Sequence, residues 1–204
     1  MMRSNEQSQL APAMVDMEQT LSELLSEKEF LGTEFLTWLW WKSEASGGVF
    51  HVKGMGDVGI RFVKHIQVES GSKDSRERVS CSGKMVQMKE ARLGLIMGKK
   101  VTRARLVVET GDITLEATIN AATLDVQSLK IMRGFDNSFE TDGGADARQG
   151  VILYRLSWVR GIRHMVHEIF LQFIARRMDD DAWSREKGGL REWILGQGRQ
   201  GLFT

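Results

Sequence analysis

Apolar residues recur at helical spacing in several segments of the chain. The pattern from Asp16 onward, with glutamates on the opposite side, predicts a helix, and a second helix follows over Phe30–Glu44. A shorter helix is expected over Met85–Met97. Val151–Met178 carries the longest amphipathic pattern and predicts one long helix, with a strand over Val151–Tyr154 as the alternative for its start. Asp179–Asp181 can cap a final short helix.

Segment Phe30–Glu44 is apolar almost all round the helix that it predicts. It places three of the chain's six tryptophans within four positions, so this helix has to be buried on most of its surface. We expect Thr33 to cap its start after a break at Gly32. Its aromatic residues at helical spacing are expected to pack in the core or at a subunit interface, and these are Phe35, Trp38 and Trp41.

Between the helical segments the pattern changes to short alternating runs that are typical of strands. The predicted strands are Val49–Lys53, Val58–Val68, Arg76–Cys81, Val101–Glu109, Ile113–Ile119 and Ser128–Met132. Ile60 and Phe62 alternate with Arg61 and His65, which indicates a half-buried antiparallel sheet. The fold class that follows is α+β: an antiparallel sheet flanked by an N-terminal helical pair and a long C-terminal helix.

The 204 residues are expected to form one domain. Residues 1–15 are mostly polar and predict a flexible tail, so the domain is expected over 16–196. Within it, residues 133–150 are rich in glycine and acidic side chains and predict an acidic flexible loop. The glycine-rich end, 197–204, is expected to be frayed.

Composition narrows the class of protein. Cys81 is the single cysteine, which excludes an internal disulfide framework and makes a thiolate metal site improbable. No apolar run approaches the roughly 18 residues of a membrane span, and the polar beginning lacks a secretory signal. We therefore expect a cytoplasmic protein that does not contact membranes.

The net charge of +1 hides an uneven distribution of charge along the chain. Residues 1–48 carry a net charge of −5, whereas residues 84–106 carry +6 and residues 151–178 carry +4. The basic residues of the second stretch are Lys84, Lys89, Arg92, Lys99, Lys100, Arg103 and Arg105. On a strand, Arg103 and Arg105 point to the same face, so this stretch can neutralise several phosphates of a duplex. The alternative is a solvated face of the sheet.

Other patterns carry no specific chemistry. His164, His167 and Glu168 fall at spacings that share a helix face, but they fit none of the usual zinc motifs, so structural histidines are favoured. Gly54–Gly59 lies between predicted strands and indicates a turn, not a phosphate loop. Asp179–Asp181 favours a helix cap over a metal cluster. We expect no catalytic residue, no metal site and no cofactor.

Two stretches, Phe30–Glu44 and Gly98–Leu106, resemble the recombination-associated protein RdgC family, particularly its short members. The likeness continues through Asp112–Leu129 and into the long helix after Val151, and it covers roughly residues 30–178. The combination of the tryptophan segment with a glycine-lysine-valine-threonine motif is its most specific part. The chain matches mainly the carboxy-terminal half of the long family members.

The resemblance implies a non-enzymatic, nucleoid-associated protein that binds double-stranded DNA without sequence preference. By occupying DNA such a protein competes indirectly with the RecA recombinase and restrains it. The resemblance also implies a homo-oligomer, since long members form a ring-like homodimer around the duplex. It carries Lys99 and Arg103 over as phosphate contacts, and charge alone adds Lys100, Arg105, Lys89 and Arg92.

Two other functions remain open at this point. One is an oligomeric interaction or scaffold module without DNA affinity, in which the tryptophan segment and the long helix bury a subunit interface. The other is a metal-dependent nuclease.

Overall fold

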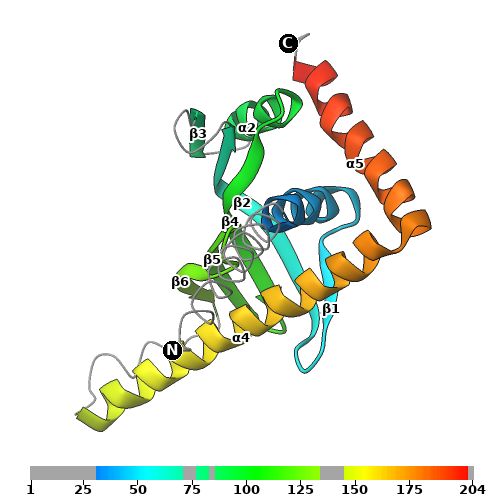
Figure 1. Ribbon diagram of the computed structural model, residues 1–204. Coiled ribbons are helices and arrows are strands. Elements are labelled where there is room, and N and C mark those ends of the chain that lie inside the picture. Colours follow the sequence, from blue (N-terminus) through cyan, green and yellow to red (C-terminus); the bar gives the residue numbers. More distant parts are fainter. Residues whose placement is uncertain (1–30, 71–76, 83–85, 134–144, 202–204) are drawn as a thin grey trace, which may run out of the picture.

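The computed structural model describes residues 31–70, 77–82, 86–133 and 145–201 (Figure 1). Its elements in chain order are a helix over residues 31–45, which we call the tryptophan helix, strands β1 (Val49–Val52), β2 (Gly56–Ser70) and β3 (Glu77–Ser82), helix α2 (Val86–Ile96), strands β4 (Lys100–Thr110), β5 (Ile113–Asn120) and β6 (Val126–Arg133), and helices α4 (Ala145–Met178) and α5 (Asp180–Gly201). The α+β class, the antiparallel sheet and the long C-terminal helix are confirmed.

The six described strands form one antiparallel sheet organised around β2. The strand order is β1-β2-β4-β5-β6, and β3 pairs with β2 outside this path. β1 lies beside Gly56–Gly59 and β3 lies beside His65–Ser70, while β4 pairs along the other edge of β2. The length of β2 therefore lets three strands share it.

One face of this sheet, which we call the inner face, is buried beneath helices. On β2 the buried apolar residues are Ile60, Phe62, Ile66 and Val68. Arg61 is exposed and His65 is half-buried on the opposite face, which we call the outer face. The predicted alternation along this strand is confirmed.

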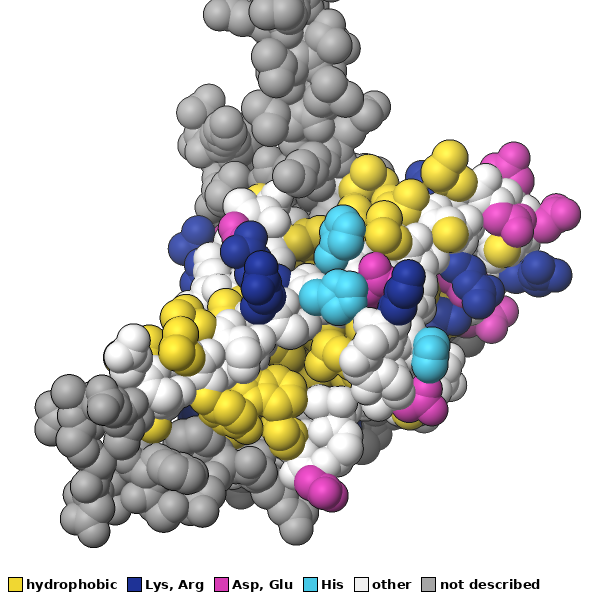
Figure 2. All heavy atoms as spheres, turned by 90° about the horizontal axis from the view of Figure 1, so that it is seen from below, with side chains coloured by type: hydrophobic (Ala, Val, Ile, Leu, Met, Phe, Trp, Pro, Cys, Tyr) yellow, Lys and Arg dark blue, Asp and Glu magenta, His cyan; other side chains and the backbone are white. Residues whose placement is uncertain are grey.

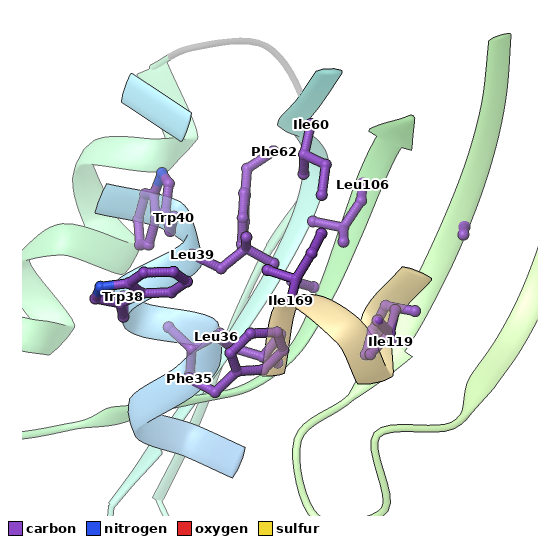
Figure 3. Packing of buried hydrophobic residues seen from close by; sticks show 14 of the residues in the cluster. Phe35, Leu36, Trp38, Leu39, Trp40, Ile60, Phe62, Leu106, Ile119 and Ile169 are labelled. Carbon is purple, nitrogen blue, oxygen red and sulfur yellow. The ribbon is translucent and has the colours of Figure 1, made fainter. Parts of the chain in front are cut away.

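The tryptophan helix and α4 fill the inner face together. Figure 3 shows Leu36 and Leu39 of the tryptophan helix gathered with Leu106 of β4 and Ile169 of α4, all of them buried. The ring of Phe35 lies 5.3 Å from that of Phe170 and 5.8 Å from that of Phe173, both on α4. These contacts place the aromatic residues of the tryptophan helix in the core of the chain itself.

Helix α5 covers a further side of the tryptophan helix. The ring of Trp193 meets that of Trp40 edge-on, with 5.2 Å between centroids. Glu186, only 8% exposed, accepts a 2.6 Å hydrogen bond from Trp38 Nε1 and lies 2.9 Å from Lys42 Nζ. Because this buried carboxylate has both a donor and a counter-charge, it joins α5 to the tryptophan helix. α5 also contacts α2, which packs on β2 and β3.

The predicted start of the tryptophan helix is wrong. Gly32 and Thr33 lie inside a helix that is continuous from residue 31, so neither a break nor a cap occurs there. A Cβ on Gly32 would stand 1.9 Å from the carbonyl oxygen of Ala121, so glycine allows the helix to approach the end of β5. The described residues contain one N-terminal helix and no helical pair, and the helix predicted from Asp16 lies outside them.

The two C-terminal helices are longer than predicted. Residues 145–150, expected in the acidic loop, form the first turns of α4, since alanine, arginine and glutamine there favour helix; residues 134–144 lie outside the description. Asp179 Oδ1 accepts a 3.0 Å hydrogen bond from the Ala182 amide, which confirms the predicted cap. α5 then continues to Gly201, through residues expected to fray. None of the described helices has the length and apolar character needed to cross a membrane.

Two glycine-to-alanine substitutions test the close approach at Gly32. Gly32→Ala is expected to lower the free energy of unfolding by roughly 1–3 kcal/mol, because the new methyl group overlaps the Ala121 carbonyl. Gly161→Ala is the matched control, since a Cβ at this position in α4 meets nothing within 4 Å. It should raise the same free energy by about 0.5–1 kcal/mol. Urea denaturation measures the free energy of unfolding of both variants. If Gly32→Ala raised it as much as Gly161→Ala does, the close packing of Gly32 would be contradicted.

Candidate nucleic-acid interface

Strand β4 carries basic residues on the outer face of the sheet. Val101, Ala104 and Leu106 are buried on the inner side, so Arg103 and Arg105 point to the outer face. This is the shared face that their spacing predicts. Lys100 is exposed at the start of the same strand, and the predicted residues Lys100, Arg103 and Arg105 therefore lie close together along β4.

The two arginines of β4 differ in their partners. Arg105 Nε lies 3.2 Å from Oε1 of Glu116, a carboxylate on β5 that is 4% exposed. Arg103 forms no ion pair with any carboxylate in the described part of the chain. Burial of His65, and then the charges of Arg103 and Arg105, lower the pKa of this histidine below its ordinary value. The positive charge on this part of the outer face is therefore only partly compensated.

Lys99, the leading phosphate contact implied by the resemblance, is turned into the protein. Its side chain is 6% exposed, and Nζ lies 2.7 Å from Oε2 of Glu77 and donates a 3.1 Å hydrogen bond to Ser70 Oγ. The same pairing holds the pKa of the Glu77 carboxyl below its usual range. Lys99 thus ties the chain before β4 to β2 and β3, and its ammonium group faces these partners and not the solvent.

Arg92 is occupied in the same way at another part of the molecule. Its guanidinium lies over the rings of Trp40 and Trp193, 5.5 Å from each centroid, and pairs with Glu44. These contacts join α2 to the tryptophan helix and α5. Lys89 belongs to α2, and its side chain lies outside the description. No contact among the described residues joins Arg92 or Lys89 to the basic residues of β4.

Arg78 is a further basic residue of this region, and it lies outside the basic stretch of residues 84–106. It lies on β3, where the register pairs it with Glu69 of β2, and its Nε donates a 2.6 Å hydrogen bond to that carboxylate. Arg78 and Arg103 both line a small polar cavity between the strand ends. The alternating run around Arg78 indicated a strand, but only the pairing of β3 with β2 brings it near β4.

A second basic surface lies on α4, and it is partly apolar. Arg160, Arg163 and His164 line a shallow depression there with the exposed side chains of Leu153 and Leu156. Figure 2 shows this face, where yellow apolar side chains gather beside dark-blue and cyan basic ones. His164 Nε2 donates a 3.0 Å hydrogen bond to the carbonyl of Lys53, which is a structural role. Across the described residues, no three histidine, cysteine or acidic side chains are grouped as metal ligands.

The pKa of His65 reports how close the β4 arginines lie. Arg103→Gln is expected to raise this pKa toward 6.5, because one of the charges that disfavour the imidazolium is removed. Arg61→Gln, an equal change of charge on β2, should leave it nearly unchanged. NMR titration of the histidine ring protons measures both values, and a shift of equal size in the two variants would refute the proximity.

Because the pKa of His65 is lowered by folding, its protonation makes the folded protein less stable as the pH falls. In the unfolded chain His65 binds a proton more readily than in the folded chain, so its contribution to stability is present above pH 6.5 and is lost as pH falls through the folded pKa. In Arg103→Gln this loss should be smaller, which urea denaturation across the same pH range would show.

Comparison with known proteins assigns no family to the chain. No protein-family model matches the sequence. A search of curated proteins also found no match. The resemblance to the RdgC family stays a prediction from the residues that carry it, and the function is argued below from charge and geometry.

Proposed function

We propose that the protein binds double-stranded DNA without sequence preference through the outer face of its sheet. The observation that carries this proposal is the position of Arg103, which points to the outer face from β4 and has no carboxylate partner among the described residues. Lys100 and Arg105 lie on the same strand within a few residues of it. A guanidinium in this setting can take a phosphate oxygen as its acceptor.

The arrangement favours phosphate contacts over contacts to base edges. Side chains two residues apart on a strand are about 7 Å apart, so Arg103 and Arg105 can reach separate phosphate groups. Contacts of this kind position a duplex but carry no sequence information. Because they release counterions, binding through them weakens steeply as salt rises. In this proposal the protein acts by occupying DNA, without catalysis, and so competes indirectly with the RecA recombinase, as the resemblance implies.

The set of contacts proposed here differs from the one implied by resemblance alone. Lys99 and Arg92 already have carboxylate partners within the chain, so we propose that they support the fold near the interface. The phosphate contacts in this proposal are Lys100, Arg103 and Arg105, which lie together on β4. Arg105 contributes while paired with Glu116, because a guanidinium has five donors and can contact a phosphate as well.

A second candidate function is an oligomeric interaction module without DNA affinity. It is favoured by the N-terminal half of α4, where Ile152, Leu153 and Leu156 are 58%, 60% and 57% exposed. In a monomer, these three large apolar side chains would be exposed to water within two turns of the helix, which is unfavourable. A homodimer that buries them is compatible with DNA binding as well, so the two candidates are separated by duplex affinity and not by oligomeric state.

Charge-neutralising variants test the DNA proposal. Lys100→Gln combined with Arg103→Gln should weaken binding to unrelated duplexes equally and reduce the salt slope of log K by about 2, one unit for each lost phosphate contact. The matched control is Lys187→Gln with Arg191→Gln, which removes the same charge from exposed positions on α5. Fluorescence anisotropy with labelled random duplexes measures both. Equal losses in the two variants, or no binding by the unaltered protein at low salt, would reject this interface.

Polar substitutions on α4 test the oligomer. Leu153→Ser with Leu156→Ser should lower the molar mass measured by light scattering, because the apolar contact between subunits is weakened. Leu195→Ser is the control, since Leu195 is also exposed, at 46%, but lies on α5. If the unaltered protein is monomeric at about 100 μM, any self-association has a dissociation constant above this concentration and is weak. This result would exclude the oligomeric module. Retained duplex affinity in a monomeric variant would separate the two functions.

A further inference from the structure

A small polar cavity lies where the ends of β2, β3, β4 and β5 meet the beginning of the tryptophan helix. Its volume is about 120 Å³. It is lined by Thr33, Gln67, Glu69, Arg78, Thr102, Arg103, Asn120, Ala121 and Ala122. This volume is about four times the share of one water molecule in the liquid, and it is well below the roughly 300 Å³ of the smallest usual ligand pockets. A single small polar group fits in this volume.

Hydrogen bonds among polar side chains fix part of the cavity wall. Gln67 and Glu69 are only 9% and 8% exposed. Gln67 Nε2 donates a 2.5 Å hydrogen bond to Glu69 Oε1, and Arg78 Nε donates a 2.6 Å hydrogen bond to the same oxygen. The charge of Glu69 is thus met by Arg78. Because these side chains come from two strands of one sheet, the cavity is formed before any ligand arrives.

The charge that remains in the cavity is positive. The described lining residues include two guanidinium groups and one carboxylate, which together carry a net charge of +1. Arg103 supplies the excess, because in the described part of the chain it pairs with no carboxylate. Arg105 lies two residues away, and its charge is offset by that of Glu116. An anion is therefore favoured in this cavity over a cation or a neutral molecule.

Hydrogen-bond donors come from more than one wall. Each arginine carries five donors, of which Arg78 uses one on Glu69 in the bond described above. Asn120 Oδ1 accepts a 2.8 Å hydrogen bond from the Ala122 amide, which leaves the NH₂ group of Asn120 as its donor. We propose that the cavity binds one phosphate group, with Arg103 of β4 and Arg78 of β3, which lie on either side of β2, as its main ligands. The proposal goes beyond duplex binding, since it requires no DNA.

Inorganic phosphate is the probe that tests this site. Phosphate is titrated without DNA at constant ionic strength set with sodium chloride, and binding is followed by ³¹P line broadening and by the midpoint of thermal unfolding. The unaltered protein should show saturable broadening and a rising midpoint, because a ligand that binds only the folded state stabilises it. Arg103→Gln should weaken the apparent phosphate affinity about tenfold or more, since a charge-assisted hydrogen bond is lost.

Two further variants separate the cavity from general charge effects. Arg61→Gln removes the same charge from the outer face, outside the cavity lining, and should leave phosphate affinity unchanged. Ala122→Leu adds bulk at an exposed position of the lining without changing charge, and should weaken phosphate binding. No saturable phosphate effect in the unaltered protein, or equal losses in Arg61→Gln and Arg103→Gln, would overturn the proposal.

A competition measurement then identifies the source of the phosphate. If the cavity takes a backbone phosphate of a bound duplex, inorganic phosphate should displace a labelled duplex at constant ionic strength, and Ala122→Leu should weaken duplex binding. If it takes free phosphate, Ala122→Leu should weaken phosphate binding and leave duplex binding unchanged. Phosphate binding to the cavity is measured without DNA. The phosphate proposal can therefore be judged even if the protein does not bind a duplex.

Discussion

Burial of the tryptophan helix on several sides is the constraint on which the rest of the structure depends. A helix that is apolar almost all round cannot lie at the edge of a two-layer protein, because one side would face water. Here the sheet covers one side, α4 covers a second through Phe35 and Phe173, and α5 covers a third through Trp40 and Trp193 (Figure 1). The indole of Trp38 needs a polar partner in this setting, and Glu186 provides it.

This packing decides which surface remains for a ligand. The tryptophan helix and α4 occupy the inner face of the sheet, so the side chains that alternate with the core residues of β4 form the outer face. Arg103 and Arg105 are placed there by the same alternation that buries Ala104 and Leu106. A rigid central strand thus positions the candidate phosphate contacts, and their orientation follows from the requirement to bury the opposite side of that strand.

The sequence was sufficient to predict most of the elements because their signals are local. Alternation with a period of two marked each of the six strands, and the 3.6-residue period marked the tryptophan helix, α2 and α4. The start of the tryptophan helix was predicted wrongly since a glycine followed by threonine usually ends one element and begins another. The reason for Gly32 lies instead in Ala121, a residue far along the chain that touches it only after folding.

The candidate site was less predictable than the fold, because charge density along a chain is not charge density in space. The basic stretch holds seven cations, yet Lys99 and Arg92 are each paired with a carboxylate distant in sequence, Glu77 and Glu44. Such pairs depend on the strand order and on where α2 packs, which no local pattern contains. A guanidinium that already has a buried or stacked partner loses that contact when it moves to a phosphate, so its gain from binding is reduced. Arg103 pairs with no carboxylate among the described residues, and its position is therefore a better guide to the binding surface than the number of basic residues around it.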